Sequence, residues 1–135
     1  MSTADLSAIY RDYIACLNRQ DWPELGRFVA PDVRHNGRDF GLAGYRAMLE
    51  RDFATIPDLA FDIRLLVAEP PHVAALLGFR CSPRGTFLGL PVEGRTVTFT
   101  ENVFYRFRDG AIVDVRSIID KGAIEDQIRD MPRPA

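Results

Sequence analysis

The sequence has very little lysine: 16 of its 17 basic residues are arginine, and Lys121 is the exception. Arginine is preferred where a planar carboxylate or phosphate must be bound, although a compositional bias explains the same count. With 19 acidic residues among 135, the formal net charge is only −2. Such a balanced chain offers no basic field to a phosphate backbone, so nucleic acid is not expected as a partner.

Long apolar runs and paired cysteines are also missing. The longest stretch without a charged side chain runs from Pro70 to Phe79, well short of the roughly 20 apolar residues that span a bilayer, so no membrane partner is expected. Residues 1–5 lack the features of a signal peptide, which predicts a cytoplasmic location. Cys16 and Cys81 form no CxxC pair, so we expect buried free thiols and no metal site. No nucleotide-binding motif is present, so no cofactor is expected.

Hydrophobic periodicity predicts helices first and strands afterwards. Apolar residues at three- and four-residue spacing favour helices over Thr3–Arg19 and Leu42–Thr55, with a short helix between them from Asp21 to about Val29. A short strand is expected at Asp32–Asn36. Alternating or continuous apolar residues then predict four long antiparallel strands, at Leu59–Val67, His72–Arg80, Arg95–Arg108 and Ala111–Asp120.

This segregation of helices and strands predicts an α+β fold in one domain over residues 1–135, with a loosely ordered tail from about residue 129. A strongly curved sheet would wrap around the helices and leave a concave apolar cavity. Its outer face would still carry apolar side chains, which favours a homodimer formed through that face.

The order of elements and the segment Gly85-Thr-Phe-Leu-Gly-Leu-Pro-Val-Glu-Gly-Arg95 resemble the SnoaL-like polyketide cyclases, also labelled ester cyclases. This family belongs to the cone-shaped superfamily of nuclear transport factor 2. Further matching segments are residues 18–22, 33–36, 57–59, 104–112 and 119–120. The resemblance implies a cone-shaped α+β barrel with three N-terminal helices packed in the sheet. It also implies a cofactor-free ring closure in which Asp120 is the general acid and base.

Two positions depart from the family pattern. Phe87 directly follows Thr86, where members commonly carry a longer insertion with a histidine. Arg116 stands where the family usually has an aromatic residue. A pocket shaped for a flat polycyclic polyketide is therefore not a firm expectation.

Asp120 and His35 are the candidate catalytic residues. An inward Asp120 would have its pKa raised by desolvation towards the range useful for proton transfer, whereas the plain alternative is a carboxylate that caps a turn. His35 precedes the turn at Asn36-Gly37 and is either a structural residue or, as the resemblance implies, a pocket residue that donates a hydrogen bond to a substrate carbonyl.

Arg116 shares one face of the last strand with Asp114 and Asp120. It either pairs with one of these carboxylates or binds an anionic group of the substrate. On the neighbouring strand three side chains share a face and are candidate substrate contacts with it: Asn102, Phe104 and Arg106. Tyr13 and Phe87 are pocket walls or core residues.

The leading hypothesis is an enzyme that moves a proton next to the carbonyl of a small, mostly apolar substrate, by cyclisation, isomerisation or dehydration. Developing negative charge would be stabilised by His35 or Asn102. A non-catalytic binding protein of the same fold is the second hypothesis. The third is an epoxide hydrolase, whose Asp–Arg–Asp arrangement would use Asp114, Arg116 and Asp120.

Overall fold

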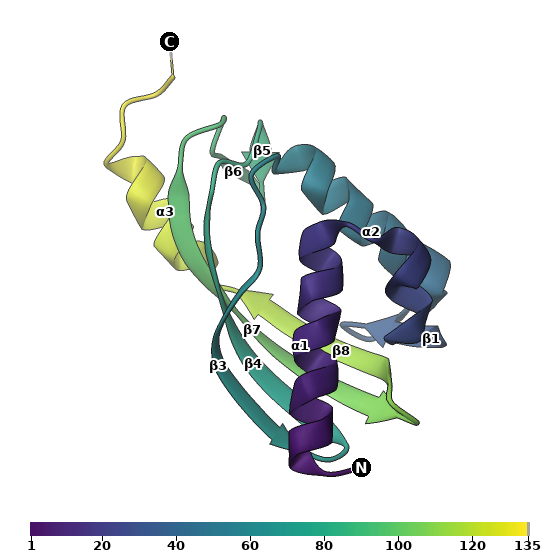
Figure 1. Cartoon of the computed structure of the whole chain (residues 1–135). Helices are drawn as coiled ribbons and strands as arrows, with labels where there is room; N and C mark the ends of the chain where they lie inside the picture. Colours follow the sequence, from purple (N-terminus) through teal and green to yellow (C-terminus); the bar gives the residue numbers. More distant parts are fainter. Residues whose placement is uncertain (135) are drawn as a thin grey trace.

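The computed structural model describes residues 1–134 and has its two long helices on the concave side of one curved sheet (Figure 1). The sheet has six strands in the order β2-β1-β8-β7-β4-β3. The six strands are β1 Val29–His35, β2 Arg38–Asp39, β3 Asp62–Glu69, β4 His72–Cys81, β7 Val97–Arg108 and β8 Ala111–Ile119. The predicted α+β fold and the four long strands are confirmed.

Helix α1, Thr3–Arg19, begins with a reciprocal capping box in which the Ser2 hydroxyl accepts from the Asp5 backbone and the Asp5 carboxylate accepts from the Ser2 backbone. It ends where Gln20 takes a left-handed conformation. The short 3-10 helix η1 follows at Trp22–Arg27, and α2 covers Gly41–Thr55. Both long helices bury an apolar stripe against the sheet, because their apolar residues recur every three or four positions.

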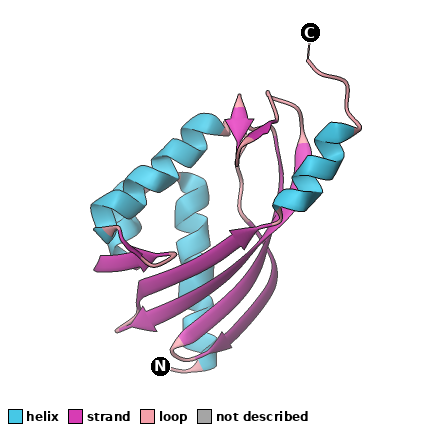
Figure 2. Cartoon of the chain, turned by 180° about the vertical axis from the view of Figure 1, so that it is seen from behind, coloured by secondary structure: helices cyan, strands magenta, loops and turns pink. Residues whose placement is uncertain are grey.

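The sheet is antiparallel except for the pair of β1 and β8, which run parallel. In the sequence, helix α2 and four other strands of this sheet, β2, β3, β4 and β7, separate β1 from β8. In the sheet, β8 nevertheless lies beside β1 (Figure 2). Asn36 ties this pair together, because its side-chain amide accepts from the Ser117 N–H at 2.8 Å and donates to the Ser117 carbonyl at 3.3 Å. The residue before it, His35, is thereby placed against β8.

Two features were not predicted. The small hairpin of β5, Thr86–Phe87, and β6, Leu90–Pro91, lies between the strands expected at His72–Arg80 and Arg95–Arg108, where the sequence predicted no strand. Helix α3, Lys121–Arg129, lies between the expected end of the last strand at Asp120 and the tail expected from about residue 129, where no helix was predicted. It forms because Asp120 caps it and because Ile124 is fully buried, while Gln127 bonds both backbone groups of Thr98 on β7.

The two faces of the sheet differ sharply in burial. On β7, Val103 and Tyr105 are 3% and 4% exposed, whereas Phe104 between them is 63% exposed. The register of β7 with β8 shifts near the hairpin, where Asp114 pairs with Arg106 but Ile112 pairs with Phe107. This bulge fixes which alternate residues of β8 face inward.

Both cysteines are free and buried, as predicted. No helix within residues 1–134 is long and apolar enough to cross a membrane.

Candidate functional site

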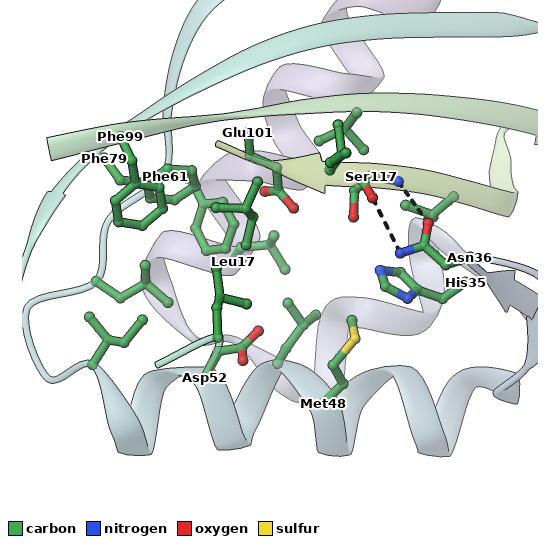
Figure 3. Close-up of a pocket in the computed structure, with 18 of the residues that line it drawn as sticks. Leu17, His35, Asn36, Met48, Asp52, Phe61, Phe79, Phe99, Glu101 and Ser117 are labelled. Carbon is green, nitrogen blue, oxygen red and sulfur yellow. Dashed lines mark hydrogen bonds between the residues drawn. The ribbon is translucent and has the colours of Figure 1, made fainter. Parts of the chain in front are cut away.

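A cavity of about 640 Å³ lies between the concave face of the sheet, α1 and α2. Most of its wall is apolar, with phenylalanines at one end and His35 at the other (Figure 3). The volume falls within the range of small-molecule sites. Apart from the tyrosines, its polar lining side chains are His35, Asn36, Asp52, Glu101, Ser117 and Lys121.

Glu101 of β7 occupies the middle of the cavity (Figure 3). Its side chain follows the inward alternation of the strand, between the buried Phe99 and Val103. Desolvation raises the pKa of the Glu101 carboxyl to about 7; the negative charge of Asp52 acts in the same direction, and a hydrogen bond with the Ser117 side chain partly opposes the rise. A carboxyl with this pKa can both accept and donate a proton near neutral pH.

Asp52 of α2 enters the same cavity from the opposite wall (Figure 3). Burial raises the pKa of its carboxyl to about 6, which the positive charge of Arg51 partly opposes. Asp52 follows Leu49 on the apolar stripe of α2 and precedes Phe53. The cavity therefore holds two acidic groups, one from the sheet and one from a helix.

His35 lies at the end of β1, with its ring stacked on Phe40 at a centroid distance of 5.6 Å and edge-on to Tyr45 at 6.1 Å. Burial, helped by the charge of Arg38, lowers the pKa of the imidazole. The ring is therefore neutral at pH 7 and can donate one hydrogen bond into the cavity.

Buried tyrosines form two hydroxyl pairs beside this site. The Tyr13 and Tyr45 hydroxyls are 2.7 Å apart, and the Tyr10 hydroxyl donates to that of Tyr105 at 3.1 Å. Tyr13, Tyr45 and Tyr105 line the cavity, and burial raises the pKa of all three. They stay protonated at physiological pH and hold the cavity wall through hydrogen bonds.

The structure places the predicted site residues in two groups. His35, Tyr13 and Phe87 lie on the cavity wall. Four others, Arg116, Asn102, Phe104 and Arg106, lie on the outer face of the sheet and are exposed.

Arg116, a candidate for binding an anionic group of the substrate, does not face the cavity, because Val115 and Ser117 take the inward positions on β8. Its side chain is 64% exposed, and its Nε lies 3.4 Å from a carboxylate oxygen of Asp114. Of the two alternatives, the structure therefore contains the internal pair. Asn102, Phe104 and Arg106 are outward for the same reason of strand alternation.

Asp120 is likewise not on the cavity wall. Strand β8 ends at Ile119, and the exposed Asp120 accepts a hydrogen bond from the Ala123 N–H at 3.1 Å as the N-cap of α3. The Asp114, Arg116 and Asp120 arrangement expected for epoxide hydrolysis does not surround a cavity, since all three avoid the concave face.

Sequence reasoning missed Glu101 and Asp52 as site residues, although both leave a signal. Glu101 is the only charged residue among the alternate positions 97 to 107 of β7. Asp52 likewise interrupts an apolar helical stripe. Within the described residues, no three histidine, cysteine or acidic side chains come together as metal ligands.

Comparisons with known proteins agree with this architecture. The family model described as SnoaL-like polyketide cyclase matches residues 7–128. A SnoaL-like polyketide cyclase from Agrobacterium tumefaciens is 51% identical, with a TM-score of 0.91, and the match covers 95% of this chain and 99% of that one. TsrD from Streptomyces laurentii is 23% identical with a TM-score of 0.82, covering 97% and 99% of the two chains, and shares the fold.

The chain matches none of the curated proteins. The family match nevertheless spans most of the chain, and the cone-shaped α+β fold that the sequence predicted is confirmed by these neighbours. The chain belongs to the SnoaL-like polyketide cyclase family.

Proposed function

We propose that the cavity catalyses proton transfer next to a carbonyl group of a small, mostly apolar substrate, with Glu101 as the general base and acid. The observation that carries this proposal is the Glu101 carboxyl in a mainly apolar cavity, where burial brings its pKa to about 7. The ionised form would remove a proton from the carbon beside the carbonyl. The protonated form would return it elsewhere on the substrate.

His35 is the proposed donor to the carbonyl oxygen. Its neutral imidazole faces the cavity and can stabilise the negative charge that an enolate develops. Asn102, the other donor considered from the sequence, is on the outer face. Ring closure, isomerisation and dehydration all begin with this proton abstraction, so the proposal covers the reaction step and not one product.

Hydrogen–deuterium exchange of 2-tetralone in heavy water tests the step, because this aromatic ketone has acidic C–H bonds beside its carbonyl. We expect the wild-type protein to accelerate exchange and Glu101→Gln to lower the rate about 100-fold or more, as loss of a general base does. Glu69→Gln, an exposed glutamate at the end of β3, is the matched control and should keep the wild-type rate.

Absence of exchange in the wild-type protein would contradict the proposal. If 2-tetralone then still bound with an affinity that Glu101→Gln changes, the non-catalytic binding protein would be the better description. An unchanged rate in Glu101→Gln would remove Glu101 from the mechanism.

The outer face supports a second proposal, a homodimer formed through the sheet. Leu65, Val67, Phe104 and Ile118 are each at least 63% exposed. The strand register joins them, since Val67 and Phe104 both pair with Ala74, while Leu65 and Ile118 are linked through Leu76 and Asn102. A contiguous apolar surface of this kind is typical of an interface. The cytoplasmic location stays a prediction of the sequence.

A further inference from the structure

The cavity contains one more acidic side chain than the proposed proton-transfer step needs. Asp52 and Glu101 both enter it, one from α2 and one from β7, and only one carboxylate is needed as the base. No ion pair within residues 1–134 involves either of them. A buried acidic group without a cationic partner is costly when ionised, unless a ligand supplies the opposite charge.

The other titratable groups around the two carboxylates do not balance them. Lys121, at the first turn of α3, also lines the cavity, but it is exposed and forms no ion pair with either carboxylate within residues 1–134. His35 is held neutral by burial. The tyrosines of α1, α2 and β7 on the cavity wall are neutral as well. Arg51 is exposed and adjacent to Asp52 on α2, and is absent from the cavity wall.

Next to the carboxylates the cavity has an aromatic end. The rings of Phe61 and Phe79 are 5.3 Å apart edge to face, and Phe79 stacks on Phe99 at 5.1 Å. Figure 3 shows these rings on the same side of the cavity as Glu101. Aromatic faces next to carboxylates suit an organic cation attached to an apolar body, because the rings attract positive charge and also bury hydrocarbon.

We propose that the ligand of this cavity carries a positively charged nitrogen, an ammonium group on an apolar body, and that Asp52 binds this group and selects for it. The inference rests on the proposed function in one respect, since it leaves Glu101 free to move the proton while Asp52 holds the charge. It excludes an anionic substrate, which would meet two like charges. An organic cation is favoured over a divalent metal ion, because the described residues bring no third metal ligand to the two carboxylates.

Binding of three matched probes tests the inference without any need for turnover: 4-phenylbutylamine, 4-phenylbutan-1-ol and 4-phenylbutanoate. They share a phenyl ring and an alkyl chain and differ in the charge of the end group. By calorimetric titration at pH 8 we expect the amine to bind about tenfold or more tightly than the alcohol, and the carboxylate to bind most weakly. The preference for the amine should diminish as pH falls to 5, since the carboxyls then take up protons while the amine stays charged.

Asp52→Asn should bring the amine down to the affinity of the alcohol and leave the alcohol unchanged. Glu50→Gln is the matched control, because Glu50 lies two residues away on α2, is exposed and pairs with Arg46. The inference would be overturned by equal binding of amine and alcohol at pH 8, by the strongest binding of the carboxylate, by an equal loss for both ligands in Asp52→Asn, or by no binding of the amine at millimolar concentration. None of these results decides whether Glu101 catalyses the exchange of 2-tetralone, because that proposal is tested by a separate measurement.

Discussion

Glu101 and Asn102 are neighbours on β7 and lie on opposite faces of one sheet. Glu101 points into an apolar cavity, where burial raises its pKa to about 7, whereas Asn102 is exposed on the outer face. The inner face holds its polar groups away from water, and this changes their chemistry. The outer face also carries charged side chains, such as Arg106 and Arg116, but these are exposed and border no comparable apolar cavity. The number of charges on a face is therefore a poor guide to where chemistry can occur.

The largest expected contrast between the faces is in folding. Val103→Asp places a charge where the wild-type side chain is 3% exposed, and we expect it to lower the unfolding free energy by about 4 kcal/mol or more. Phe104→Asp, one residue along, alters a side chain that is 63% exposed and should cost each folded subunit less than about 1 kcal/mol. Denaturant unfolding of both variants, at a protein concentration where both are monomeric, measures the difference. Equal losses would show that the two faces are not distinct.

How far the sequence predicts this molecule is visible in the same two strands. The alternation along residues 97–107 and 111–119 predicts that strands form, because a half-buried strand needs one apolar face. It does not by itself say which face a polar residue such as Arg116 takes when the cavity also admits polar groups. The bulge near Val113 further moves the register, since both Ile112 and Val113 are buried.

The candidate site was only partly predictable for a related reason. His35 lies at the cavity wall, as the family resemblance implied, and Tyr13, expected to be a pocket wall or core residue, lines the cavity as well. The acidic residues of the cavity were not predicted as site residues. Acidic residues are usually exposed, so a carboxylate at an inward position goes against this preference. In the sequence it looks like an interruption of the apolar pattern rather than a site residue. Such contradictions are where functional residues are expected, and both Glu101 and Asp52 belong to this class.

The second contrast is the dependence of stability on pH. Between about pH 4.5 and 7 the folded protein keeps a proton on Glu101 that the unfolded chain has lost, so the unfolding free energy falls as pH rises. Glu101→Gln removes this contribution of the Glu101 proton to the pH dependence of the unfolding free energy. We expect the variant to match the wild type near pH 4 and to exceed it by about 3 kcal/mol at pH 8, from a rise in pKa from 4.5 to about 7. Thermal unfolding across this range measures it, and a variant less stable at pH 8 would contradict the assignment.

A third experiment addresses the outer face alone. If the exposed apolar surface forms a homodimer, a charge at its centre should weaken association about 100-fold, because the charge would be buried against the partner. Phe104→Asp is that change, and Ala47→Asp, on the exposed side of α2, is the control. Sedimentation over a dilution series distinguishes them. A wild-type protein that is monomeric at high concentration, or a variant that dimerises equally well, would disprove the interface.

The smallest expected effect is at Asp120, and it tests most directly whether the chemistry is confined to the cavity side of the sheet. Asparagine caps a helix about as well as aspartate, so Asp120→Asn should keep the hydrogen bond from Ala123 and alter the unfolding free energy by less than about 0.5 kcal/mol. Asp120→Ala loses the cap and should cost about 1 kcal/mol. Because Asp120 is off the cavity wall, both variants should exchange 2-tetralone at the wild-type rate. A loss of exchange in Asp120→Asn without a loss of stability would return the catalytic role to Asp120, since only a group that touches the substrate would be sensitive to that single change of charge.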